Sequence, residues 1–167
     1  MNEVKIKCTE QEQKDMLKYI VNEEGKIDFR ILLPIPLNCW QGDLSDNEKQ
    51  FSPYNWYDWC TKNWGTKWNA YGQEKDWYKN VEFNNDELIL RFQTAWLAPY
   101  GWLIALSNNF KKTIEFKVCD EGNDKVLEYT FEYSGSSTVI LNNEESERGR
   151  MMSFIYKDYS TWSEEDE

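Results

Sequence analysis

The residues best suited to chemistry lie in one short block, residues 55–71, which contains four of the nine tryptophans. Indole rings beside carboxamides, a carboxylate and a lysine could line a ligand pocket. The candidate binding residues are Asn55, Trp56, Asp58, Trp59, Asn63 and Lys67. The alternative, which we favour, is that the rings pack a helix onto a sheet, because two adjacent faces of one helix cannot both be apolar and exposed.

Several kinds of catalysis are excluded by composition. The chain has no histidine, which removes Ser-His-Asp and Cys-His catalysis and zinc sites built on histidine. None of the four cysteines belongs to a C-x-x-C pair, so neither a zinc site nor a redox dithiol is indicated. Asp28 and Asp58 could pair as catalytic carboxylates, but a strand end and a helix surface favour solvated charges. We therefore predict no catalytic residue, no metal site and no cofactor.

The charge balance limits the partners. With 30 acidic and 19 basic residues, the formal net charge is −11. Such a chain repels nucleic-acid phosphates and anionic lipid, so direct nucleic-acid binding and a membrane are not expected, whereas basic protein surfaces are attracted. The alternative is that the charge serves solubility alone. The predicted acidic surface combines outward strand positions with the C-terminal end: Glu115, Glu128, Glu132, Glu164, Glu165, Asp166 and Glu167.

The compartment follows from what the sequence lacks. There is no run of about 20 apolar residues, and the first residues lack the apolar stretch of a signal peptide. Three of the cysteines sit in apolar-periodic stretches, where buried free thiols are the usual outcome. Together these observations predict a cytoplasmic protein.

The elements that position these residues can be read from periodicity. Apolar residues at helical spacing predict helices near 10–22, 53–64 and 99–110. Thr9 and Glu12 form a capping box for the first helix, Ser52-Pro53 begins the second and Pro99 begins the third. Alternating residues predict strands near 4–8, 27–33, 88–95, 113–119, 126–133 and 138–141, with a hairpin joining 68–83 to 87–95.

Strands with one apolar and one polar face, mixed with helices, predict an α+β fold. We expect an antiparallel sheet with helices mainly on one face, plus an N-terminal strand-helix unit. The length suits one domain, which we place at residues 1–156. Residues 157–167 are expected to form an acidic, flexible tail.

The tryptophan block also carries a resemblance. Residues 55–71 resemble a signature of the YubB-like ferredoxin-like family, which is encoded by phages, plasmids and prophages. Flanking segments are similar to the family's opening strand, its central step and its closing strand: Asp28-Phe29 with Pro34-Ile35-Pro36, Gln93–Trp96 before Pro99, and Glu128–Phe131. The resemblance covers about residues 3–135. It implies a ferredoxin-like fold and a mobile-element origin, and no established activity.

This chain departs from the family pattern at Ile35, Gln93 and Leu97-Ala98. Gln93 stands where the family has aspartate, which argues against a catalytic carboxylate at that position. We therefore expect a non-enzymatic, acidic interaction protein of a phage or mobile element that acts on a host protein or defence factor. The alternative is a small-molecule-binding or enzymatic domain that uses the Trp-rich region around residues 55–71. An exposed acidic stripe favours the first, and a concave pocket with two carboxylates favours the second.

Overall fold

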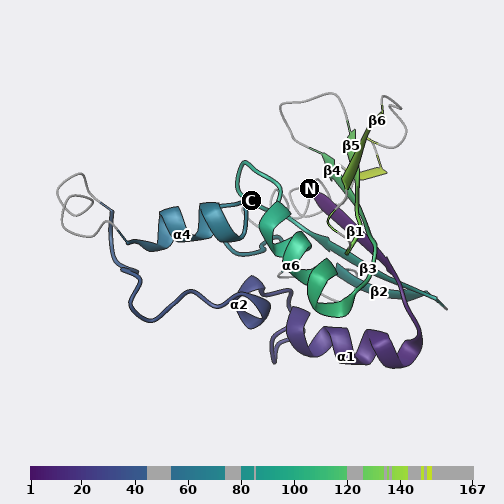
Figure 1. Ribbon diagram of the computed structural model, residues 1–167, viewed down its shortest axis with the longest axis horizontal. Coiled ribbons are helices and arrows are strands. Elements are labelled where there is room, and N and C mark those ends of the chain that lie inside the picture. Colours follow the sequence, from purple (N-terminus) through teal and green to yellow (C-terminus); the bar gives the residue numbers. More distant parts are fainter. Residues whose placement is uncertain are drawn as a thin grey trace, which may run out of the picture.

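The protein is built around one six-stranded sheet (Figure 1). The computed structural model describes residues 1–44, 54–73, 80–84, 86–119, 126–133, 135, 137–142, 148, 150 and 151. The strands are β1 Asn2–Lys7, β2 Val81–Asn84, β3 Glu87–Phe92, β4 Ile114–Cys119, β5 Val126–Phe131 and β6 Ser137–Asn142. The helices are α1 Glu10–Ile20, α2 Phe29–Leu32, α4 Trp56–Asn63 and α6 Tyr100–Phe110.

The strand order identifies the fold. The sheet runs β2-β3-β1-β4-β5-β6, and every neighbouring pair is antiparallel. Its first four strands, with α1 and α6, follow the chain order β-α-β-β-α-β, the arrangement of ferredoxin-like folds. Strands β5 and β6 extend this unit at one edge. The predicted α+β, ferredoxin-like antiparallel sheet is therefore confirmed.

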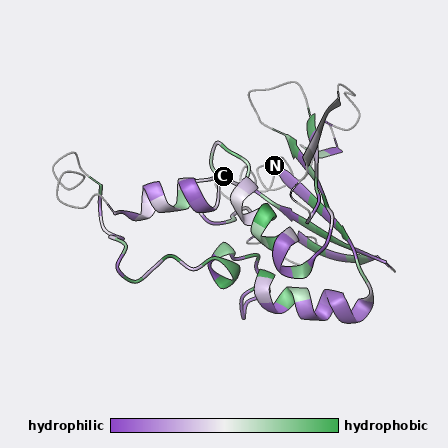
Figure 2. Ribbon diagram, in the orientation of Figure 1, coloured by the Kyte–Doolittle hydropathy of each residue, from purple (hydrophilic) through white to green (hydrophobic). Residues whose placement is uncertain are grey.

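Local signals set the ends of α1 as predicted. The Thr9 hydroxyl accepts a hydrogen bond from the Glu12 backbone N–H, and the Glu12 carboxylate accepts one from the Thr9 N–H at 2.8 Å. This capping box satisfies two backbone donors that a helix start would otherwise leave unpaired. Most of α1 is hydrophilic in Figure 2, and only Gln13, Met16 and Ile20 are buried, so the helix covers the sheet with a narrow stripe.

The predicted strand at residues 27–33 is wrong. Only Ile27 makes a β-bridge there, with Val21, and residues Phe29–Leu32 form the short helix α2. The Asp28 carboxylate caps this helix by accepting a hydrogen bond from the Arg30 N–H at 2.9 Å. Phe29 is fully buried in the core. A good cap together with the burial of one large ring outweighs the β propensity of the segment.

The second helix also begins later than predicted. Its N-cap is Asn55, and α4 runs over Trp56–Asn63. The proposed cap at Ser52-Pro53 lies outside the described residues. The third helix, Tyr100–Phe110, agrees with the predicted range, and Trp102, Leu103 and Leu106 of its stripe are buried.

One face of the sheet carries the main core. Apolar side chains of β1, β3, β4 and β5 meet residues from all four helices in a single cluster. Its centre is aromatic: the Phe29 ring lies 4.7 Å from Trp102, 5.5 Å from Phe92 and 5.7 Å from Trp64. The pairs of Phe29 with Phe92 and with Trp64 are edge-to-face, a geometry that adds to the stabilisation from buried area. The helices cover this face, as expected.

The opposite face is covered in part, and by a charged contact. Glu3 on β1 is 1% exposed, and its carboxylate accepts hydrogen bonds from Arg91 on β3 and from Arg150, each at 2.8 Å. Next to Arg150, Met151 is helical, and it packs with Cys119 and Val126 in a second buried cluster. Residues 150–151 therefore return to the face of the sheet that the other helices leave open. The predicted tail at 157–167 lies outside the described residues.

None of the helices in the described part of the chain has the length and apolarity needed to cross a membrane.

Candidate functional site

The two polar candidates at the start of α4 serve its N-cap. The Asn55 side-chain oxygen accepts a hydrogen bond from the Asp58 N–H at 3.0 Å, and its amide donates one to the Asp58 carboxylate at 2.8 Å. Asn55 is buried, whereas Asp58 is exposed. An asparagine N-cap contributes about 1 kcal/mol to a helix. The pair thus has a helix-initiating role in the structure.

The two tryptophans of α4 are half-buried, and Trp64, which follows the helix, is fully buried. Trp64 is 2% exposed, and its indole N–H donates to the Leu33 carbonyl at 3.0 Å. The half-buried Trp59 packs edge-to-face on Trp64 at 5.7 Å, and Trp56 donates to the Gly42 carbonyl at 3.0 Å. Asn63, another candidate, donates its side-chain amide to the Trp59 carbonyl at 2.8 Å. These contacts hold α4 against the core.

The junction after α4 is tight and directs the following residues outward. Gly65 has φ +91°, a left-handed conformation that favours glycine. A Cβ on Gly101, near the start of α6, would lie 2.1 Å from the Asn63 carbonyl oxygen, so the backbones of α4 and α6 meet directly. The Trp102 N–H also donates to the Trp64 carbonyl at 3.2 Å. Because the backbones of α4 and α6 leave no room between them, Lys67 and Trp68 lie outside this contact, beside the loop that precedes α6.

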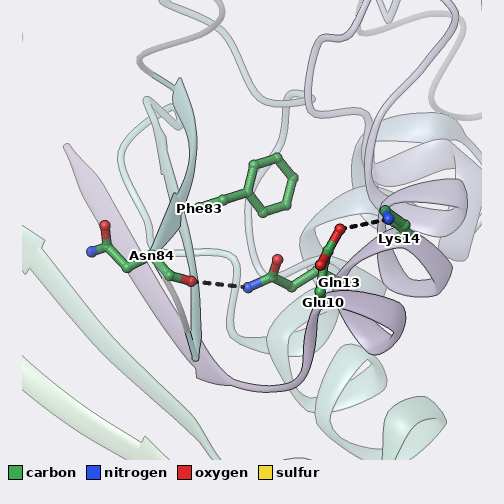
Figure 3. Close-up of a pocket in the computed structure, with 5 residues that line it drawn as sticks. All are labelled: Glu10, Gln13, Lys14, Phe83 and Asn84. Carbon is green, nitrogen blue, oxygen red and sulfur yellow. Dashed lines mark hydrogen bonds and ion pairs between the residues drawn. The ribbon is translucent and has the colours of Figure 1, made fainter.

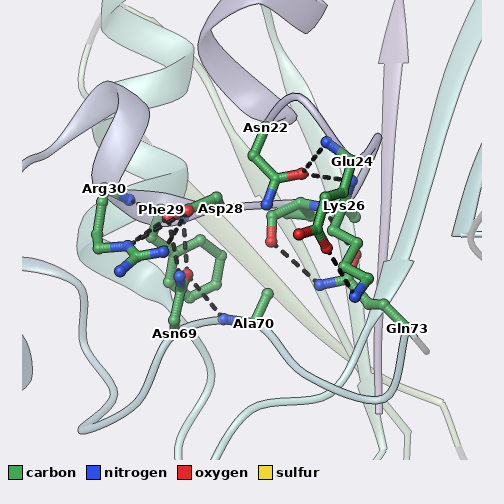
Figure 4. A network of polar contacts seen from close by, with 10 residues as sticks. Asn22, Glu24, Lys26, Asp28, Phe29, Arg30, Asn69, Ala70 and Gln73 are labelled. Atoms are coloured by element: carbon green, nitrogen blue, oxygen red, sulfur yellow. Dashed lines mark hydrogen bonds and ion pairs between the residues drawn. The ribbon is translucent and has the colours of Figure 1, made fainter.

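A polar network fixes the segment after the junction (Figure 4). The Asn69 side-chain oxygen accepts from the Phe29 N–H at 2.8 Å, and its amide donates to Asp28 at 2.8 Å. Gln73 makes a matching pair of hydrogen bonds with the backbone of Ile27, at 2.8 and 3.0 Å. Asp28 has a lowered pKa: burial raises it, but hydrogen bonds from Arg30 and Asn69 outweigh that effect. The network joins residues 69–73 to the start of α2.

Two exposed tryptophans meet beside this junction, and we call Trp68 and Trp96 the indole clamp. The Lys67 ammonium lies over both rings, 3.4 Å from the Trp96 centroid and 4.2 Å from the Trp68 centroid. Trp68 is 51% exposed and Trp96 is 77% exposed. The Tyr71 ring packs edge-to-face on Trp68, with centroids 6.4 Å apart. The candidate Lys67 is thus a part of an exposed cation–π group.

The backbone holds Trp96 outward under strain. Trp96 has φ +66°, which costs a residue with a side chain about 1–3 kcal/mol and persists only where the surroundings enforce it. The preceding carbonyl, of Ala95, accepts hydrogen bonds from the fully buried Thr66 hydroxyl at 3.0 Å and from the Leu97 N–H at 2.8 Å. Backbone hydrogen bonds between Tyr71 and Gln93 tie the two segments together.

A separate pocket lies between α1 and the edge strand β2 (Figure 3). Its volume is about 350 Å³, and Glu10, Gln13, Lys14, Phe83 and Asn84 line it. Lys14 pairs with Glu10 at 2.6 Å, and the Gln13 amide donates to the Asn84 carbonyl at 3.3 Å. The pocket has one carboxylate, which is already neutralised by a lysine, and no residue of the tryptophan block.

The predicted acidic surface is placed only in part. Glu115 and Glu132 are exposed, whereas Glu128 is half-buried and pairs with Lys117 at 3.1 Å across β4 and β5. Glu164, Glu165, Asp166 and Glu167 lie outside the described residues. One of the three described acidic residues is therefore paired with a lysine, and two are exposed.

Three of the four cysteine thiols are suppressed as nucleophiles. All four cysteines are buried, and none of them forms a disulfide. Burial raises the pKa of Cys60 to about 12, and it also raises the pKa of Cys8 and of Cys39. A thiol acts as a nucleophile only as the thiolate, which a raised pKa suppresses. Among the residues that the structure describes, no three His, Cys, Asp or Glu side chains lie close enough to hold a metal ion.

Comparison with known families agrees with this architecture. Residues 63–166 match a family described as the ferredoxin-like domain in Api92-like proteins, and this range is more than half of the chain. The protein belongs to this family. No curated protein and no solved structure matches the chain. The family match contains the indole clamp, β2–β6 and α6, whereas β1 and α1, which complete the β-α-β-β-α-β unit, precede it.

The family match and the resemblance read from the sequence cover different ranges. The resemblance covers about residues 3–135, whereas the family match covers residues 63–166. Within the matched range, Arg150 contacts the buried Glu3, so this late segment helps to cover the sheet. Sequence reasoning considered Trp68 as one of the rings of the tryptophan block that could line a pocket, but it did not name Trp96. The available signal was a tryptophan directly after Lys67, and a second one in a loop just before Pro99.

Proposed function

We propose that this protein is a non-enzymatic interaction protein of a phage or other mobile element, which binds a basic surface of a host protein in the cytoplasm. The observation that carries the proposal is the indole clamp. Two tryptophans are more than half exposed on a small domain, and one of them is held outward by a strained backbone. Exposed aromatic groups of this kind mark interaction sites, and tryptophan is enriched among residues that dominate binding energy.

The overall charge supports a basic partner. A net charge of −11 produces a negative field that attracts positive surfaces and raises the rate of association. The exposed carboxylates of Glu115 and Glu132 contribute to this field. A protein of this charge would compete with nucleic acid for a basic surface, which is consistent with blocking a host or defence factor that binds phosphates.

The alternative, a small-molecule or enzymatic site in the tryptophan block, has less support. Asn55, Asp58 and Asn63 are engaged in hydrogen bonds within α4, and Trp64 belongs to the core. The pocket between α1 and β2 lies away from the block and does not bring two carboxylates together. A surface contact therefore explains the exposed groups better than a pocket does.

Capture of a partner from host lysate tests the proposal. The wild-type protein, immobilised, is expected to retain a basic protein at low salt and to lose much of it at high salt. The double variant W68A/W96G is expected to retain at least tenfold less of the same protein. Trp40→Ala, which removes another exposed tryptophan outside the clamp, is the matched control. Equal retention by wild type and double variant contradicts the proposed contact.

The charge component has its own measurement. Deleting residues 163–167 removes four carboxylates and is expected to slow association with the captured partner while leaving the melting temperature nearly unchanged. The difference between the full-length and shortened proteins should shrink as salt shortens the Debye length from about 10 Å at 0.1 M to about 3 Å at 1 M. Equal rates and equal salt dependence would show that this end only aids solubility.

A further inference from the structure

The indole clamp has the form of a receptor for a cation. The faces of Trp68 and Trp96 converge on one point, because the single ammonium of Lys67 lies over both rings at 4.2 and 3.4 Å. Lys67 makes no ion pair within the described part of the chain. Its placement there is attributable to the rings, whose faces are negative and attract cations.

The clamp keeps its shape without help from Lys67. The backbone before Trp96 is fixed by the buried Thr66 hydroxyl, and Trp68 is supported by the Tyr71 ring. Both supports come from outside the cation–π contact. The rings would therefore remain in place, with their faces exposed to solvent, if the ammonium left. A preorganised pair of faces binds without a cost of ordering.

We propose that the indole clamp binds a lysine or arginine side chain of the basic partner, and that Lys67 is an internal occupant which the partner's cation displaces. This inference rests on the proposed function and names the chemistry of its contact. A cationic side chain fits because it meets two electron-rich faces within a protein of net charge −11. An anionic group is disfavoured by both properties, and a nucleotide base is disfavoured by the charge on its phosphate.

Lys67 makes the contact selective. A partner cation must replace a favourable contact that is worth little at an exposed site, so the exchange is easy for a side chain delivered with other contacts. A free cation in solution lacks those contacts and has to compete with Lys67 alone. The internal lysine thus lowers the affinity for isolated cations, and its removal should raise that affinity.

Titration with tetramethylammonium chloride tests the clamp without any partner. Binding is followed by the indole N–H signals of Trp68 and Trp96 in NMR spectra, with sodium chloride at equal ionic strength as the reference. Lys67→Ala is expected to bind about two- to fivefold more tightly than wild type, the change that corresponds to one exposed cation–π contact. Lys62→Ala, which removes a neighbouring exposed lysine on α4, is the matched control and is expected to behave as wild type.

Two ring variants complete the test. Trp96→Gly is expected to abolish the binding gained by Lys67→Ala, and folding is preserved because glycine suits φ +66°. Trp96→Phe is expected to retain part of the binding, since it keeps an aromatic face. Equal affinities of wild type and Lys67→Ala, or unchanged binding in Lys67→Ala/Trp96→Gly, overturn the proposal.

A neutral probe, 3,3-dimethyl-1-butanol, whose tert-butyl group has the size of a trimethylammonium group, separates charge from apolar contact. It is expected to bind at least threefold more weakly than tetramethylammonium, and equal binding overturns the proposal by showing an ordinary apolar patch. This titration uses no partner protein. Its failure overturns the clamp alone, whereas failure of the lysate capture overturns the interaction function, so the two results are distinguishable.

Discussion

The two faces of the sheet bury side chains of opposite chemistry. The helix-covered face is apolar, with Phe29, Trp64, Phe92 and Trp102 in contact at its centre. The other face buries a carboxylate, Glu3, between two arginines. The comparison teaches that alternation along a strand shows which residues share a face, but not whether that face meets water.

The difference arises from which part of the chain covers each face. The helix-covered face is closed by α1, α2, α4 and α6, and three of these helices, α1, α4 and α6, have an apolar stripe that can be recognised locally. Glu3 is covered by Arg150, which is 147 residues away in the sequence. The side chain becomes buried only because this distant segment brings a guanidinium to it. A buried carboxylate is tolerated when it is paired and hydrogen-bonded in this way.

The largest loss of stability is expected from a substitution on the apolar face. Trp64→Ala should lower the free energy of unfolding by about 3–5 kcal/mol, because it removes a ring that is 2% exposed and leaves a cavity. Trp68→Ala, four residues later and half exposed, should change it by less than about 0.5 kcal/mol. Chemical denaturation followed by circular dichroism measures both. Similar values for the two variants would contradict the assignment of Trp64 to the core.

A smaller loss is expected on the charged face. Glu3→Gln should cost about 2–3 kcal/mol, because it leaves Arg91 and Arg150 without their shared carboxylate. The value stays below that of a fully buried pair since Arg150 is 38% exposed. Denaturation at neutral pH measures it. Glu87→Gln, a half-buried residue on the same strand pair with no ion pair in the described part of the chain, is the control and should have little effect.

Lowering the pH should gradually remove the stabilisation that the Glu3 carboxylate provides. Burial tends to raise the pKa of Glu3, but hydrogen bonds from Arg150 and Arg91 outweigh it and hold the pKa below its ordinary value. Because the folded protein has the lower pKa, the stabilisation is present above the unfolded value of about 4.3 and is lost as the pH falls through the folded value. The difference between wild type and Glu3→Gln should therefore narrow below about pH 4. A difference that is constant with pH would exclude this role.

The smallest effect is expected at the half-buried pair on β4 and β5. Glu128→Gln removes the carboxylate that pairs with Lys117 at 3.1 Å, and it should change the free energy of unfolding by less than about 1 kcal/mol. Partly exposed pairs gain little because water and salt screen them. Denaturation at low and high salt measures the change. If Glu128→Gln lowered the free energy of unfolding as much as Glu3→Gln does, the two ion pairs would contribute equally to stability, which would contradict this prediction.

Much of the fold follows from local signals. The capping box at Thr9 and the proline before α6 identified two helices, and alternation placed Leu88, Leu90 and Phe92 on one face of β3. The segment at 27–33 was misassigned because its apolar spacing also suits a short helix, and the decisive cap by Asp28 was not recognised. Four residues are too few for a helical period to appear clearly.

The candidate site was predicted less well than the fold. The tryptophan block was recognised, and Lys67 was among its candidates, but the exposed partner Trp96 lies 29 residues further along the chain. Their meeting depends on the direct contact between the backbones of α4 and α6 at Gly101. A contact of this kind depends on tertiary packing, so residue types and spacing alone do not reveal it.

The place of β1 in the sheet has a consequence for biosynthesis. This first strand pairs on both sides with strands made later, Glu87–Phe92 and Ile114–Cys119. At roughly 5–20 residues per second, a ribosome needs about 4–16 s to add the 80 residues between Lys7 and Glu87. Throughout that time the nascent chain carries Val4 and Ile6 on an unpaired strand, whose backbone is open to wrong partners. The central part of the sheet can therefore form only after β3 and β4 have both been made. By then α1 and the β2–β3 hairpin are already present, and β1 can pair with β3 and β4.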